Sequence, residues 1–226
     1  RTCNCLNHGE HGGHRVIKEN LSASVSPWFA FTMNPLLLDF PDSFDTERLT
    51  IRAPRVEDAQ EIVDAVTESL PELRPWMSWA KDPVTLDYQI ARLRQVMAQW
   101  ITREELGLHA YLKGTPTLVL SSGLHGIDWQ AGKFEIGYWV RTKYVGQGFV
   151  TEAVNGITAF TFKHLRANRV EIRCDAHNIR SAAVARRCGF LLEGILRHDS
   201  LDVSGELRST LIFSKLSANE FNYYDE

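Results

Sequence analysis

The sequence has few cysteines, no long apolar run and no excess of basic residues. Four cysteines in 226 residues do not make the framework of a disulfide-rich secreted domain. No stretch approaches the roughly 20 apolar residues that a membrane-spanning helix needs. The apolar stretch at residues 26–40 contains two prolines and lacks the basic start and cleavage site of a secretion signal. With a formal net charge of -3, we expect a cytoplasmic protein without nucleic-acid or membrane partners.

Residues 1–32 differ from the rest because they show neither a helical nor a strand period, and the first methionine is Met33. Zinc sites usually join two separated pairs of ligands, a spacing that does not occur among the candidate ligands here: Cys3, Cys5, His8, His11 and His14. We therefore favour a disordered or non-native N-terminal extension over a metal site. We predict one domain over residues 33–220 and a short tail over 221–226.

Apolar periodicity predicts seven strands and four helices after Met33. Alternating or continuous apolar patterns predict strands over residues 48–54, 106–112, 117–127, 134–140, 169–175, 190–196 and 207–216. Apolar residues at helical spacing predict helices over residues 56–70, 83–101, 149–165 and 178–188. The two prolines in 71–81 predict a break between the first two helices. The three strands within 106–140 have meander spacing, which favours an antiparallel sheet.

The stretch YVGQGFVTEA places Gly146 and Gly148 between a predicted strand and a predicted helix. Backbone N–H groups at a helix start bind phosphate oxygens, and glycine lets the backbone approach closely. A plain strand-to-helix turn is the alternative. A dinucleotide fingerprint would need a third glycine at Thr151, and the Gly-Lys-Ser/Thr triplet of a P-loop does not occur. Nicotinamide and nucleoside-triphosphate enzymes are therefore disfavoured.

KYVGQGFVTEA, followed by NIRSAAVARRCGF at 178–190, resembles the GCN5-related N-acetyltransferases, abbreviated GNAT. TERLTIRAP, LRPWMSWA and FEIGYWV make the chain similar to the branch that includes ribosomal-protein alanine N-acetyltransferases. The resemblance implies an α+β fold (mixed α/β). Its mostly antiparallel, twisted sheet would have about seven strands, flanked by about four helices, with strands that splay around the glycine loop. It also implies acetyl-CoA as the acetyl donor and no metal.

The resemblance assigns coenzyme-binding residues. Trp139 and Val140 would offer backbone groups to the pantetheine amides, and Asn178 and Ser181 would lie beside the thioester. Asparagine is also a good helix N-cap, so Asn178 has a structural alternative. The pyrophosphate would be held by Val145, Gly146, Gln147, Gly148, Phe149, Val150 and Thr151.

Acetyl transfer to an amine requires a base for the amine and an acid for the leaving thiolate. Glu135 is the candidate base, and alternation places it on one sheet face with Gly137 and Trp139. A solvated strand residue is the equal alternative, with Glu171 and Asp199 in reserve. An α-amine has a pKa of about 7.8, so one carboxylate suffices to deprotonate it.

The resemblance also implies a residue for the acid. Many of these enzymes use a tyrosine where this chain has Ala185. The ribosomal-protein branch uses a serine in that role, and Ser181 matches it. The acidic residue that accompanies this serine would fall near Asp199 or Ser200, and Ser200 is at the best-matching position.

Trp76 and Trp79 lie where the family places substrate-binding elements, although tryptophans also fill cores. The predicted function is acetyl-CoA-dependent N-acetylation of a primary amine. The acceptor would be a protein N-terminal α-amine of the ribosomal-protein type or a small-molecule amine. A coenzyme-A-binding module without catalysis is the alternative, and a homodimer is possible for this family.

Overall fold

The computed structural model describes residues 34–217, so the predicted extension 1–32 and tail 221–226 lie outside the described residues. The strands are β1 (Ser43–Asp45), β2 (Leu49–Arg52), β3 (Leu106–Leu112), β4 (Leu118–Asp128), β5 (Lys133–Val140), β6 (Arg169–Asp175), β7 (Leu191–Leu201) and β8 (Leu207–Leu216). The helices are α1 (Ala59–Leu73), α2 (Leu86–Thr102), α3 (Phe149–His164) and α4 (Ile179–Arg187). None of the helices in this part of the chain is both long and apolar enough to cross a membrane.

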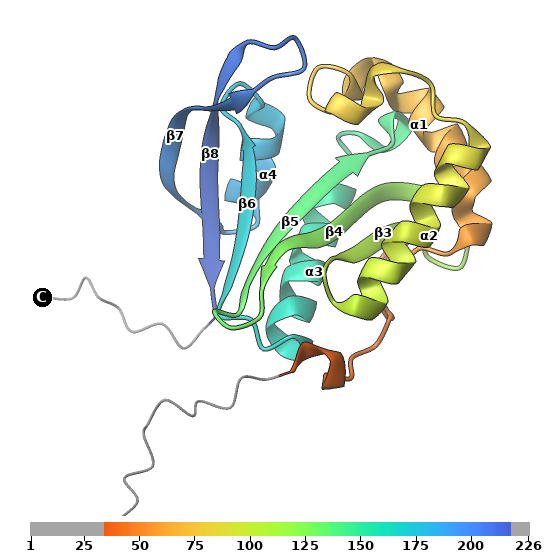
Figure 1. The fold of residues 1–226 in the computed structure, drawn as a ribbon, viewed down its shortest axis with the longest axis horizontal. Coiled ribbons are helices and arrows are strands. Elements are labelled where there is room, and N and C mark those ends of the chain that lie inside the picture. Colours follow the sequence, from red (N-terminus) through yellow and green to blue (C-terminus); the bar gives the residue numbers. More distant parts are fainter. Residues whose placement is uncertain (1–33, 218–226) are drawn as a thin grey trace, which may run out of the picture. The chain divides into compact units, whose positions relative to one another are not determined.

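One sheet contains the strands in the order β1-β2-β3-β4-β5-β6-β8-β7, shown in Figure 1. Every neighbouring pair is antiparallel except β5 and β6, which are parallel. The mixed α+β prediction is therefore confirmed. The described sheet has eight strands rather than about seven, because β1 is only three residues long and too short to show a period.

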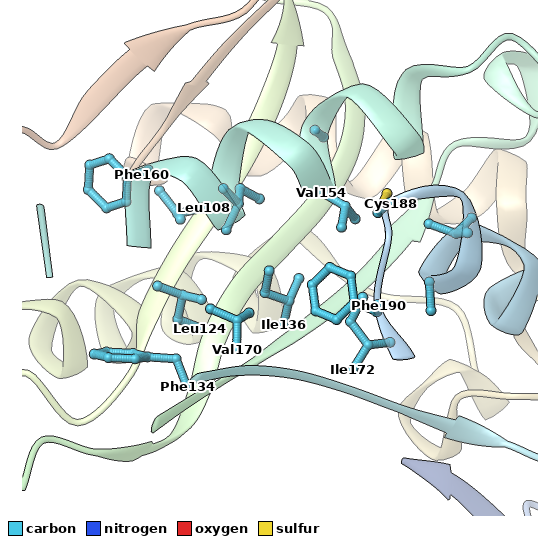
Figure 2. Packing of buried hydrophobic residues seen from close by; sticks show 14 of the residues in the cluster. Leu108, Leu124, Phe134, Ile136, Val154, Phe160, Val170, Ile172, Cys188 and Phe190 are labelled. Atoms are coloured by element: carbon cyan, nitrogen blue, oxygen red, sulfur yellow. The ribbon is translucent and has the colours of Figure 1, made fainter. Parts of the chain in front are cut away.

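The two faces of the sheet are covered by different helices. Apolar residues of α3 and α4 pack on one face against Phe134, Ile136 and Phe213, forming the larger core cluster. Figure 2 shows Val154 and Phe160 of α3 above Ile136 and Phe134 of the sheet. Residues of α1 and α2 form a second cluster with Tyr111 and Leu118 on the other face. Burial of each large side chain in these clusters contributes roughly 1.5–3 kcal/mol.

Two predicted helix boundaries were wrong. Helix α1 continues through Pro71 to Leu73, because packing of the buried Leu70 and Leu73 in the second core cluster outweighs the backbone hydrogen bond that the proline removes. Helix α2 begins at Leu86 instead of residue 83. Its N-cap is Thr85, whose side-chain oxygen accepts from the backbone N–H of Tyr88, so the threonine rather than the Asp-Pro pair starts the helix.

Strands β5 and β6 are paired over only three residues of each strand. The pairing runs from Lys133 opposite Arg169 to Glu135 opposite Glu171. Beyond this point the strands diverge, which Figure 1 shows as an opening that widens away from the paired end. The predicted splay is confirmed, and it leaves the edge of β5 after Glu135 without a neighbouring strand.

Candidate active site

A cleft of about 1430 Å³ occupies the region where β5 and β6 part. Its walls come from β5, the glycine loop, the start of α3, β6, α4 and the far end of β7. The cleft therefore brings together segments that lie far apart in the sequence. Of the predicted coenzyme residues, Gln147 alone does not line it; its side-chain amide donates to the carbonyl of Lys143.

The glycine loop has the geometry of an anion site. Gly146 and Gly148 have φ angles of +79° and +81°, a region that other residues adopt at a cost. Gly148 is the N-cap of α3 and has no side-chain cap. Within residues 34–217, the backbone N–H groups of 146–151 make no hydrogen bond to the chain. These donors, at the positive end of a helix dipole, suit the oxygens of a phosphate.

Arg48 holds this loop from the strand side, a role that the sequence did not reveal. Its guanidinium stacks over Phe149 at 4.1 Å and donates to the carbonyl of Gln147 at 3.1 Å. It also pairs with Glu152 of α3 at 2.6 Å. A cation with 42% of its side chain exposed therefore lies beside the free N–H groups, which adds to the attraction for an anion.

Helix α1 anchors the other end of the loop. Arg141, which is buried, donates to Glu61 at 2.8 Å and to Glu68 at 2.7 Å. Glu68 also accepts from the backbone N–H of Lys143, and the Ser69 hydroxyl accepts from that of Thr142. The segment that leads from β5 into the loop is thus fixed to a rigid helix.

The open edge of β5 presents backbone groups to the cleft. The N–H of Arg141 donates to Val119 of β4, and backbone directions alternate along an antiparallel strand. The backbone groups of Trp139 therefore point toward β4, whereas those of Tyr138 and Val140 point toward the open edge. All three residues line the cleft.

Ser181 and Asn178 meet at the start of α4. The Asn178 side-chain oxygen accepts from the backbone N–H of Ser181 at 3.1 Å, so asparagine is the helix N-cap. The Ser181 hydroxyl lies 3.0 Å from the hydroxyl of Tyr138, a contact that sequence reasoning missed. Burial raises the pKa of Tyr138 above its usual value, so this phenol is protonated at neutral pH. Burial likewise raises the pKa of the nearby Cys174 thiol, which disfavours a thiolate nucleophile.

Glu135 lines the cleft and is paired with His125. The His125 Nε2 atom lies 3.2 Å from Glu135 Oε1, and the two residues are register partners on β4 and β5. The hydrogen bond to Glu135 raises the pKa of His125 above its usual 6.5. Gly137 makes the pair possible, because a Cβ there would lie 2.6 Å from the His125 ring. The histidine was not among the sequence candidates, since only the strand register brings it to Glu135.

The other acidic candidates differ in their position relative to the cleft. Glu171 does not line the cleft, and its carboxylate pairs with Arg169 at 2.7 Å. Asp199 and Ser200 do line it, at an irregularity in β7 between Leu196 and Ser200. The position of the absent tyrosine, Ala185, is fully buried in the core.

Both candidate acceptor-site tryptophans are exposed, so they do not fill the core. Trp76 is 37% exposed and lines the cleft. Trp79 is 42% exposed, lies 6.2 Å from the Trp139 ring and lines a neighbouring pocket instead. In residues 34–217 no three His, Cys, Asp or Glu side chains group as metal ligands do, and the N-terminal candidates lie outside this range.

Comparison with known proteins agrees with this geometry. Residues 48–191 match the model of the family described as Acetyltransferase (GNAT) domain. A relative from Bacillus subtilis (strain 168), named "Putative ribosomal N-acetyltransferase YdaF", is 31% identical over 75% of this chain and 92% of its own.

Two solved structures share the fold. The microcin C7 self-immunity acetyltransferase MccE, in complex with acetyl-CoA and AMP, is 24% identical, with a TM-score of 0.72 over 79% of this chain and 98% of its own. The ribosomal L7/L12 acetyltransferase RimL, in complex with coenzyme A, is 17% identical, with a TM-score of 0.70 over 76% of this chain and 95% of its own. The chain is an acetyltransferase that belongs to the GNAT family.

Proposed function

We propose that this enzyme transfers the acetyl group of acetyl-CoA to a primary amine, and that the acceptor is the N-terminal α-amine of a protein of the ribosomal-protein type. The main support for acetyl-CoA as the acetyl donor is the row of backbone N–H groups at 146–151, which have no hydrogen-bond partner in the described chain. They lie beside Arg48, at the end of the open edge of β5. The names of the relatives, which include ribosomal N-acetyltransferases, support the acceptor. A homodimer and a cytoplasmic location stay predictions.

Two parts of the coenzyme, the pyrophosphate and the pantetheine arm, would bind to different segments along the cleft. Its pyrophosphate would accept hydrogen bonds from the loop, because these donors have no other partner in the described chain. Its pantetheine amides would pair with the open edge of β5, where the backbone groups of Tyr138 and Val140 point outward. Trp139 would contribute its ring rather than its backbone to the acceptor side, next to Trp79.

Glu135 would act as the base. The α1 and α2 face of β5 carries Glu135 and Trp139, whereas Tyr138 points to the face that α4 covers, where it contacts Ser181. The acceptor and the donor would therefore meet from opposite faces of the sheet. As the amine nitrogen attacks the thioester carbonyl carbon, its proton would pass to the Glu135 carboxylate, directly or through water. The His125 ring holds that carboxylate in place.

Ser181 would protonate the leaving group. As the carbon–sulfur bond breaks, the coenzyme thiolate would take the proton of the Ser181 hydroxyl, and the serine would regain one from solvent. Either hydroxyl can be the donor in the contact between Tyr138 and Ser181. When Tyr138 donates to Ser181 Oγ, the serine proton is left for another acceptor, such as the thiolate. Asn178 would fix the start of α4 and thereby the position of the serine.

The competing function is coenzyme-A binding without catalysis. Free-thiol release separates the two: the protein is mixed with acetyl-CoA and a panel of peptides and amines, and coenzyme A is followed together with product mass. Amine-dependent thiol release with an acetylated product supports the enzyme. Tight acetyl-CoA binding by calorimetry without release for any amine would support the binding module instead.

A further inference from the structure

A second pocket, of about 600 Å³, lies between α2 and the sheet face that carries Glu135. Its lining residues come from α1, α2, β3, β4 and β5. Five residues line both this pocket and the cleft, so the two spaces meet at β5: Met77, His125, Gly137, Tyr138 and Trp139. The junction is thus beside the His125–Glu135 pair, where the acceptor amine would lose its proton.

The floor of the pocket is a row of glycines. Gly107 of β3 is the register partner of Gly123 of β4, which is in turn the partner of Gly137 of β5. Paired residues share a sheet face, and two inter-strand spacings give a floor roughly 10 Å long. The His125 ring covers the Gly137 end of this row and Val96 of α2 covers the Gly107 end, since a Cβ at either glycine would lie 2.6 Å from that side chain.

A buried histidine without a partner lines this pocket. His109 is 8% exposed, and its Nδ1 atom has no hydrogen-bond partner in the described part of the chain. Burial lowers the pKa of His109 to about 4, so the ring is neutral at pH 7. Ser121, its register partner, and Gln89 of α2, also 8% exposed, line the same pocket. These three side chains offer neutral donors and acceptors.

The pocket is poorly suited to a polycation. Among its described lining residues Glu105 is the one carboxylate, and Arg92 adds a positive charge. A polyamine or aminoglycoside would place several ammonium groups here with one carboxylate to pair them. Peptide amides, by contrast, need neutral donors and acceptors. Tyr88 and Arg92 are exposed at the pocket, so a longer chain could leave toward solvent between them.

We infer that this pocket receives the first two or three residues of an acceptor peptide, with the amine at the His125–Glu135 end and peptide groups or small uncharged side chains at His109, Gln89 and Ser121. The pocket volume of about 600 Å³ lies in the size range of sites that enclose a small ligand, which suits two or three small residues. The inference rests on the proposed function and adds the residues that select the acceptor. His109 is then a specificity residue that acts on peptides and not on single amino acids.

The test compares acceptors of different length. The probes are a neutral tetrapeptide amide with N-terminal serine, serinamide and spermidine. The variants are His109→Leu, Ser121→Val and the control His164→Leu on α3. Ser121→Val removes a second polar group from the pocket, so it still tests the inference if His109→Leu does not fold. We expect His109→Leu and Ser121→Val to raise KM for the tetrapeptide about tenfold, because a hydrogen bond to a buried group is lost. We expect KM for serinamide and Kd for acetyl-CoA to stay within about twofold, and His164→Leu to match wild type.

Failure of the proposed function and failure of the pocket assignment would give different results. If the wild-type protein acetylates no amine, the proposed function falls and this inference falls with it. If it acetylates amines but both pocket variants change tetrapeptide and serinamide kinetics alike, or neither, the pocket assignment is overturned while the function stands. Preference for spermidine over the tetrapeptide would also overturn it.

Discussion

The hydroxyl of Tyr138 on β5 lies 3.0 Å from the hydroxyl of Ser181 on α4, across the opening between β5 and β6. The backbone carbonyl of Ser181, 3.2 Å from the same phenol oxygen, is the alternative acceptor for the single proton of the tyrosine. This contact ties the strand that would carry the coenzyme arm to the helix that would supply the acid. It also places a phenol in the cleft although the tyrosine position familiar in the family is Ala185, which is buried.

Replacing either hydroxyl should slow acetyl transfer without weakening donor binding. We expect Ser181→Ala to lower kcat by roughly three- to thirtyfold at every pH, a modest factor because a thiol pKa of about 8.5 makes the thiolate a good leaving group. Tyr138→Phe should lower kcat less. Because the two act as a unit, the double variant should be no slower than Ser181→Ala alone. Additive losses would mean that the contact is structural only.

The Glu135–His125 pair should set the pH dependence. We expect Glu135→Gln to lower kcat most at low pH, where the acceptor is an ammonium ion, and to approach wild type above the pKa of the amine. The matched control is Glu171→Gln on β6, since Glu171 is the register partner of Glu135 but does not line the cleft. A Glu135→Gln profile parallel to wild type would remove Glu135 from the mechanism.

The interaction between Glu135 and His125 can also be measured by NMR titration, without any acetyl transfer. The carboxylate raises the pKa of His125, so its NMR titration midpoint should lie above 6.5 in wild type and fall toward 6.5 in Glu135→Gln. A midpoint that the substitution leaves unchanged would mean that the two side chains do not interact in solution.

Charge at the glycine loop should abolish donor binding. Gly146→Asp places a carboxylate beside the proposed pyrophosphate, and like charges about 4 Å apart repel by roughly 4 kcal/mol at an effective dielectric constant near 20. We expect the Kd of acetyl-CoA and of coenzyme A to rise at least a hundredfold. Gly114→Asp is the control, because Gly114 has a similar φ of +75° and open space around it but lies outside the cleft. Equal acetyl-CoA affinities for the two variants would mean that the loop is only a strand-to-helix turn and does not bind the pyrophosphate.

Loosening the anchor of the loop should weaken donor binding less. Glu68→Gln breaks its charge pair with Arg141, and we expect Kd for acetyl-CoA to rise about three- to tenfold. Asp64→Asn, an exposed change on the same helix, should have no effect.

The Glu68 carboxylate should also contribute to acid stability. Burial opposes ionisation, yet hydrogen bonds from Arg141 and the Lys143 N–H bring the pKa of Glu68 below its usual 4.5. This stabilisation is complete above pH 4.5 and is lost as pH falls through the lowered value. Thermal melts should therefore show Glu68→Gln closest to wild type at the lowest pH. A constant difference at all pH values would contradict the charge pair.

Removing residues 1–32 should leave donor binding unchanged. Among the residues that the structure describes, the first to line the cleft is Glu47, well inside the domain that we propose to begin at Met33. Calorimetry on chains that begin at residue 1 and at Met33 should give the same Kd within about twofold. A large loss of affinity in the shorter chain would place the boundary earlier.

Much of the fold could be predicted because its elements are encoded locally. The alternation in 134–140 and the helical spacing in 149–165 require no knowledge of distant residues, and both elements are present. The paired glycines were also visible in the sequence, since two glycines between a strand and a helix start predict either an anion site or a plain turn. The short strand β1 was missed because three residues are too few to show a period. The course of α1 through Pro71 was missed because packing of the helix overrides the proline.

By itself, then, the sequence determined the order of the elements, the glycine loop and the acetyltransferase resemblance. Only the tertiary structure decided which side chains meet. His125 reaches Glu135 through the register of β4 and β5, and Tyr138 reaches Ser181 from 43 residues away. Likewise, Gly107, Gly123 and Gly137 form one floor because two registers align them. The apolar periodicity of a segment depends on which of its own residues are buried, so it can be recognised locally. Strand register depends on the packing of the whole sheet and therefore cannot be predicted from a local pattern.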